Sequence, residues 1–79
     1  MSEMIIRNRA SKEVGYIKTD SRGKQTAYNV KREKLGCFDP KTNFTKDKNN
    51  RVLGTGNMLV GIILSVAYAS AKRQLIINI

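Results

Sequence analysis

The strongest constraint on this chain is an uncharged, largely apolar stretch from Val52 to Ala71, which follows a strongly basic region. A helix needs about 20 apolar residues to cross roughly 30 Å of membrane hydrocarbon. The stretch reaches that length, but it opens with Gly54-Thr55-Gly56-Asn57, which suit lipid poorly, and its apolar centre covers only Met58 to Ala69. Because strand-like sequence precedes it, we expect a helix of a soluble domain and not a membrane span.

Periodicity predicts that this helix covers about residues 57–73. Asn57 is a favourable N-cap, and Lys72 and Arg73 suit the negative end of the helix dipole if they lie in its last turn. Five apolar residues share one helical face and are expected to pack on a sheet: Met58, Leu59, Ile62, Ile63 and Val66. The opposite face carries no charge either, so it also needs a cover.

We expect a second copy of the chain to provide that cover. Gly61, Ser65 and Ala69 are spaced by four, which lets another backbone approach the helix closely. Packing within one protomer is the alternative reading of the same stripe. Since symmetric dimers are the commonest oligomers, the sequence predicts a homodimer. The expected interface consists of Val60, Gly61, Leu64, Ser65 and Tyr68.

The region before the helix reads as short strands separated by turns. The expected strands are EVGYIKT, QTAYNV, KLGCF and FTKD, and the expected turns are DSRGK, KREK, DPKTN and KNNR. An apolar residue followed by glycine occurs at Val14-Gly15, Leu35-Gly36 and Leu53-Gly54. Glycine within a strand usually marks a bulge or a close approach of another backbone.

Both ends of the chain are rich in β-branched residues. We expect residues 4–6 and 75–79 to form strands, paired with each other or with a neighbouring chain, although a helix continuing through Ile79 would also fit. The predicted fold class is therefore α+β, in one domain of residues 1–79. An antiparallel β-meander of about five short strands occupies the basic region 1–54, and the apolar C-terminal helix packs on the sheet.

An enzyme is not expected. The chain has no histidine, and its six carboxylates are scattered over turns among lysines. Cys37 alternates with Leu35 in a predicted strand, which favours a buried structural thiol. We therefore predict no catalytic residue, cofactor or small-molecule substrate. With one cysteine and no apolar leader core in the first residues, a cytoplasmic location is expected.

Metal and phosphate motifs are incomplete. The segment from Asp47 begins like a calcium-binding loop, but Arg51 stands at the fifth position and no bidentate glutamate follows, so no metal site is predicted. GTGNMLVG lacks the third glycine of a dinucleotide fingerprint, because Leu59 occupies that position. It is better explained as a flexible turn between a strand and the helix.

The formal net charge is +9, and residues 7–51 hold 13 Lys or Arg against 5 Asp or Glu. Such an excess attracts polyanions, and nucleic acid is the leading candidate partner. Aromatic residues between the cations suit either base stacking or the core: Tyr16, Tyr28, Phe38 and Phe44. The predicted phosphate contacts are Arg22, Lys24, Lys31, Arg32, Lys34, Lys41, Lys46, Lys48 and Arg51. The alternative function is a protein-interaction or homo-oligomeric assembly subunit that uses the apolar C-terminal helix. In that case the charges serve only to keep the protein soluble.

Overall fold

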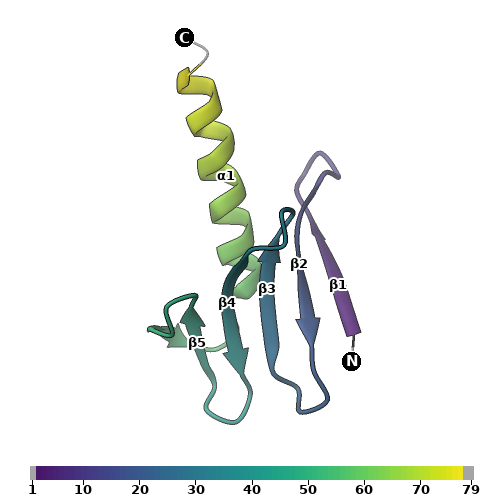
Figure 1. The fold of residues 1–79 in the computed structure, drawn as a ribbon, viewed down its shortest axis with the longest axis vertical. Helices are drawn as coiled ribbons and strands as arrows, with labels where there is room; N and C mark the ends of the chain where they lie inside the picture. The colour runs from purple at the N-terminus through teal and green to yellow at the C-terminus, as the bar shows by residue number, and fades with distance from the viewer. Residues whose placement is uncertain (1, 78–79) are drawn as a thin grey trace.

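A computed structural model describes residues 2–77 and the side chains of residues 2–69. Six strands form one antiparallel sheet in which each strand pairs with its neighbours in the chain, and one helix follows (Figure 1). The elements are β1 (Ser2–Arg7), β2 (Glu13–Thr19), β3 (Gln25–Asn29), β4 (Lys34–Asp39), β5 (Phe44–Asp47), β6 (Val52–Thr55) and α1 (Leu59–Ile77). The predicted α+β fold is confirmed, with six strands where about five were expected.

Four of the five hairpins turn in the same way. In each, the side-chain Oδ1 of a leading Asn or Asp accepts hydrogen bonds from the backbone N–H groups two and four residues later; the leading residues are Asn8, Asp20, Asn29 and Asp47. The fourth residue of each turn has a positive φ: Ser11, Gly23, Arg32 and Asn50. Asp and Asn favour such turns because their short side chains bond to the backbone nearby. The register of the sheet is therefore set locally.

The recurring pair of an apolar residue and a glycine marks three β-bulges, as predicted. β2, β4 and β6 each carry one extra residue against the preceding strand, namely Val14, Leu35 and Leu53. At Gly36 an added Cβ would lie 2.6 Å from the carbonyl oxygen of Lys46, so a neighbouring backbone comes too close for a side chain. A bulge bends its strand and increases its twist, so the three together curve the sheet beneath the helix.

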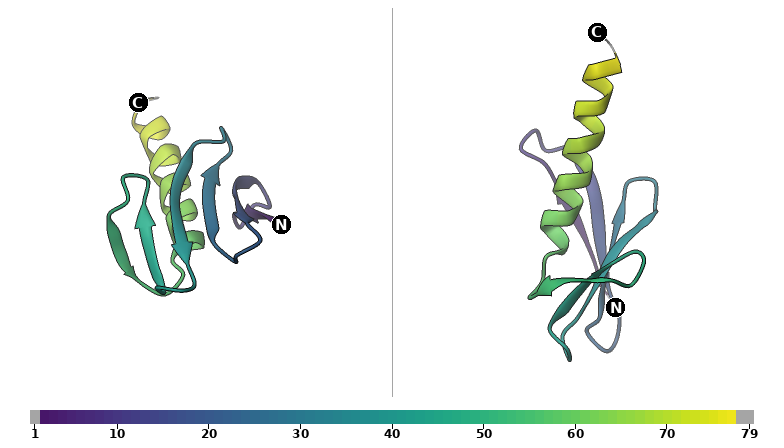
Figure 2. Two further views of the ribbon diagram at one scale, coloured as in Figure 1. Left: turned by 60° about the horizontal axis from the view of Figure 1, so that its bottom comes forward. Right: turned by 90° about the vertical axis from the view of Figure 1, so that its left-hand side faces the viewer.

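The core lies between α1 and one face of the sheet (Figure 2). Ile17 and Ala27 are buried from the sheet, and Leu59 and Ile63 are buried from the helix. Ile62 packs partly against them, as predicted. Met58 and Val66 are 41% and 37% exposed, so neither belongs to the buried core, although they belong to the predicted face. Met58 precedes the helix, and its sulfur would lie 3.0 Å from a Cβ added at Gly54 of β6. Val66 follows Leu59 by seven residues, about two helical turns, so it shares the face of Leu59 but is not covered as fully.

The start of the helix is fixed to the sheet. The side chain of Asn57 accepts a hydrogen bond from the Leu59 N–H at 3.1 Å, which confirms it as the N-cap. The buried Thr45 hydroxyl donates to the Gly56 carbonyl oxygen at 2.5 Å and accepts from the Met58 N–H at 3.1 Å. Gly56 itself has a φ of 84°, which favours glycine. The strand-to-helix turn is thus a defined connection.

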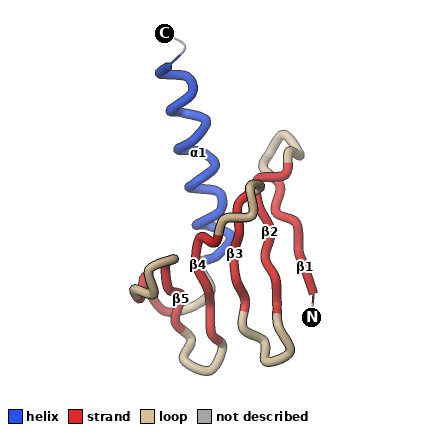
Figure 3. The backbone as a smooth tube through the Cα atoms, in the orientation of Figure 1, coloured by secondary structure: helices blue, strands red, loops and turns tan. Residues whose placement is uncertain are grey.

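The helix is longer than predicted and extends well beyond the sheet (Figure 3). It continues to Ile77, so the strand expected over residues 75–79 is wrong as far as residue 77, and residues 78–79 lie outside the described residues. Lys72 and Arg73 consequently precede the last turn. The strand expected at residues 4–6 is confirmed as part of β1, which pairs with β2. Within residues 2–77, no helix has the length and apolarity required to cross a membrane.

Candidate nucleic-acid interface

The face of the sheet opposite α1 is the candidate site. The helix packs against β2, β3 and β4 from one side only. Successive strand residues point to opposite faces, so the inward Ile17 directs its neighbours Tyr16 and Lys18 away from the helix. Cross-strand pairing extends this assignment to the other strands. We call this surface the open face; its residues include Tyr16, Lys18, Thr26, Tyr28, Lys34, Cys37, Phe44 and Lys46.

Two stacked tyrosines form the centre of the open face. The rings of Tyr16 and Tyr28 lie 5.0 Å apart with an angle of 15° between their planes. The Lys18 ammonium is 5.9 Å from the Tyr16 centroid and 5.8 Å from the Tyr28 centroid, and the Arg32 guanidinium carbon is 5.7 Å from the Tyr16 centroid. Such cation–π contacts hold both cations over the sheet.

Burial separates the four aromatic residues into different roles. Tyr16 is only 8% exposed, so its ring supports the cluster and is not a free stacking surface. Phe38 faces the helix and packs against the core. Tyr28 is half-buried, and Phe44 is 37% exposed. These last two rings are the aromatic surface that the open face offers to a ligand.

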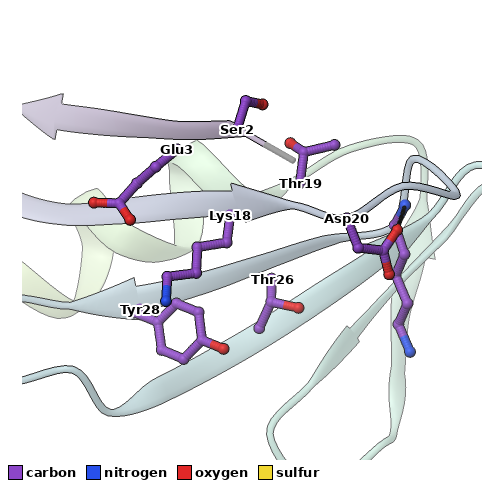
Figure 4. Close-up of a pocket in the computed structure, with 8 residues that line it drawn as sticks. Ser2, Glu3, Lys18, Thr19, Asp20, Thr26 and Tyr28 are labelled. Carbon is purple, nitrogen blue, oxygen red and sulfur yellow. Dashed lines mark hydrogen bonds between the residues drawn. The ribbon is translucent and has the colours of Figure 1, made fainter.

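A hollow of about 450 Å³ lies beside this cluster (Figure 4). It is lined by Ser2, Glu3, Lys18, Thr19, Asp20, Lys24, Thr26 and Tyr28. The Lys18 side chain runs along its wall toward the Tyr28 ring. Asp20 is already engaged, because its carboxylate accepts hydrogen bonds from the backbone of Arg22 and Lys24. The lining holds two ammonium groups, from Lys18 and Lys24, and two carboxylates, from Glu3 and Asp20, so the hollow by itself carries no net charge.

The predicted phosphate-contact residues do not all share one surface. Lys34 and Lys46 lie on the open face, and Arg32 reaches it over the Tyr16 ring. Three others lie in the turns at one end of the strands: Arg22, Lys24 and Lys41. The remaining three lie in turns at the opposite end: Lys31, Lys48 and Arg51. The open face thus brings together three of the predicted residues, with Lys24 at the rim of the hollow.

Lys18 was missing from the predicted set, although it lies at the centre of the cluster. The signal was present in EVGYIKT, where Lys18 is two residues from Tyr16 and must share its face in a strand. The prediction favoured cations in turns over a cation within a strand. Alternation within the strand was the better guide to this site.

The predicted oligomer interface lies on the outer side of the helix, away from the sheet. Val60, Gly61, Leu64, Ser65 and Tyr68 are all exposed in the protomer. Val60 is 43% exposed and Leu64 is 38% exposed. An added Cβ at Gly61 would meet nothing within 4 Å, so the surface there is open.

Two other predicted features have structural roles. Cys37 is a buried free thiol on the open face, as expected of a structural cysteine. Asp47 organises a turn by accepting hydrogen bonds from the Asn49 and Arg51 N–H groups. No protein-family model, curated protein or solved structure matches the chain.

Proposed function

We propose that this protein is a non-enzymatic binding module that holds single-stranded nucleic acid on its open face. The observation that carries the proposal is the placement of Lys18 and Arg32 over the stacked Tyr16 and Tyr28 rings. Cations held in place by rings lose less side-chain entropy when they contact a phosphate. Lys34 and Lys46 add positive charge along the same face.

The exposed rings favour a single strand as the ligand. Unpaired bases stack on aromatic side chains while cations contact the backbone, and neither contact requires a particular sequence. Tyr28 and Phe44 offer the rings, and the neighbouring lysines offer the cations. Three acids lie on this face: Glu3 is opposite Lys18, Asp39 is opposite Phe44, and Glu13 is paired with Arg7 at 3.3 Å. Lysine and arginine nevertheless outnumber the acids on the open face, and the net charge of +9 also favours an anionic ligand.

Removing two open-face cations tests this proposal. We expect Lys18→Gln/Lys46→Gln to weaken binding of a mixed-sequence single-stranded oligonucleotide by about 10- to 100-fold at low salt. The slope of log affinity against log salt should fall by about 1.4, because each lost phosphate contact on a single strand removes about 0.7. Fluorescence anisotropy with labelled DNA and RNA at several salt concentrations measures both quantities.

The matched control is Arg9→Gln/Lys12→Gln, which removes the same charge from the exposed β1–β2 turn. This variant should lose less than about threefold in affinity, through the general field alone. Equal losses in the two variants would mean that net charge, and not the open face, attracts the ligand. Absence of binding by the unmodified protein at low salt would refute the proposal.

A second candidate function is homo-oligomeric assembly through the helix. It is favoured by the exposure of Val60 and Leu64 on a helix that extends beyond its own sheet. Burial of apolar surface there would stabilise the assembly by about 25 cal/mol for each Å² removed from water. A Gly61→Leu substitution would block close approach along this side and should dissociate such an assembly in sedimentation velocity. Lys31→Glu/Arg32→Glu should leave it intact, because both residues lie in the β3–β4 turn.

A further inference from the structure

The two edges of the sheet are protected to different degrees. The strand order places β1 at one edge and β6 at the other. β6 has four residues and includes Gly54, so it offers a short edge. β1 has six residues, and its sequence SEMIIR contains no lysine, proline or glycine. Met4 and Ile5 on β1 are 50% and 42% exposed. Natural proteins usually protect such an edge, because its unpaired N–H and C=O groups can bind another strand.

The charges on β1 identify the strand that fits this edge. Along the strand, Glu3 comes two residues before Ile5 and Arg7 two residues after it. If a second β1 strand lies antiparallel with Ile5 on the two-fold axis, Glu3 of each copy stands opposite Arg7 of the other. Met4 then stands opposite Ile6, and Ile5 opposite its own copy. Opposite charges and apolar side chains directly across an antiparallel pair are both stabilising.

We propose that β1 is a self-complementary edge through which two copies of this chain form a symmetric dimer with a continuous sheet. Antiparallel pairing at this register preserves the faces of both sheets, because paired residues project to the same side. The two-fold axis runs perpendicular to the sheet, so both helices lie on one side and both open faces on the other. An isologous contact of this kind closes after two copies.

The existing ion pair of Arg7 is compatible with this dimer. Within the protomer Arg7 donates to the Glu13 carboxylate at 3.3 Å and to the Ser11 carbonyl oxygen at 3.1 Å, and the Arg7 and Glu13 side chains are both more than half exposed. A guanidinium has five N–H donors, so Arg7 can contact a second carboxylate without leaving the first. The inference does not depend on nucleic-acid binding, since it concerns the edge of the sheet and not the open face.

Complementary charge variants test the register directly. In Glu3→Arg alone, arginine would face arginine at both ends of the paired strands, and in Arg7→Glu alone, glutamate would face glutamate. Each variant by itself is expected to dissociate, with a dimer dissociation constant at least about tenfold weaker than that of the unmodified chain. Mixed in equal amounts, the two should form a one-to-one heterodimer, because every cross-strand pair is then again of opposite charge. Sedimentation velocity on each sample measures these states, and circular dichroism checks that each variant is folded.

The control is Arg9→Glu, which changes the charge as Arg7→Glu does but lies in the β1–β2 turn, and it should remain dimeric. Ile5→Lys places two ammonium groups at the two-fold axis, where they repel each other. This variant by itself should therefore be monomeric. Dimers that persist in Ile5→Lys and vanish in Gly61→Leu would overturn the proposal in favour of the helix. A monomeric unmodified chain at about 100 μM, an open-ended polymer, or failure of the mixture to associate would also overturn it.

Discussion

Replacing Gly15 with alanine is expected to remove about 3 kcal/mol from the free energy of unfolding, which is near the upper end for overpacking a core. An added Cβ would clash with the carbonyl oxygen of Tyr28 and lie 2.7 Å from Cγ2 of Ile63. The first obstacle is backbone of β3 and the second is a buried side chain of α1, so neither can move without disturbing the core. A domain of this size has only about 5 kcal/mol to lose.

Urea unfolding followed by circular dichroism measures this loss, and Gly61→Ala provides the matched control. Gly61 lies in the exposed part of α1, where an added Cβ meets nothing within 4 Å. Alanine there should stabilise the protein by about 0.5–1 kcal/mol, because glycine is a poor helix former. If Gly15→Ala unfolds at the same urea concentration as the unmodified chain, then β2, β3 and α1 do not pack as closely around Gly15 as described.

Truncation of Ile63 to alanine is the second change with a large expected effect. Ile63 is fully buried between α1 and the sheet, together with Leu59, Ile17 and Ala27. Loss of its side chain removes apolar contacts and leaves a cavity, which costs about 2–5 kcal/mol for an isoleucine of this kind. We expect the midpoint of thermal unfolding to fall by more than about 10 °C, given 4–8 °C for each kcal/mol in a domain of this size.

The adjacent Leu64→Ala is its control, since Leu64 is 38% exposed on the outer side of the helix. At protein concentrations low enough to prevent association, it should cost about 1 kcal/mol or less. Similar losses for the two variants would show that the helix is oriented differently on the sheet.

The hairpins could be predicted from sequence because their determinants are local. DSRGK and DPKTN carry residues whose own side chains or backbone preferences produce the turn, and both are turns in the structure. The glycines after Val14, Leu35 and Leu53 correctly indicated bulges, because only a close backbone requires glycine within a strand. Strand β6 was not predicted as a separate strand, because its four residues are too few to show a clear alternation of apolar and polar side chains.

Features that depend on packing partners were harder to predict. Leu59, Ile62 and Ile63 of the predicted face pack on the sheet, whereas Met58 and Val66 are more exposed. Periodicity identifies a shared face but not how completely a sheet covers it. A strand was expected at residues 75–79 from β-branched residues, but such residues lower helix propensity by only tenths of a kcal/mol, and no neighbouring strand competes for them. In the candidate site, charge alone identified Lys34 and Lys46, whereas Lys18 could be found only by following the alternation of β2.

The simple strand order also has a consequence for how the chain folds. Every strand pairs with a strand adjacent in sequence, so the sheet has a low contact order for a β-rich protein. Each hairpin closes a loop of only a few residues, and closing short loops takes little entropy from the chain. We therefore expect the sheet to assemble hairpin by hairpin and faster than sandwiches of similar size, with docking of α1 as the one long-range step. During synthesis α1 emerges after all six strands, so until then the inner face of the new sheet is the surface that chaperones would recognise.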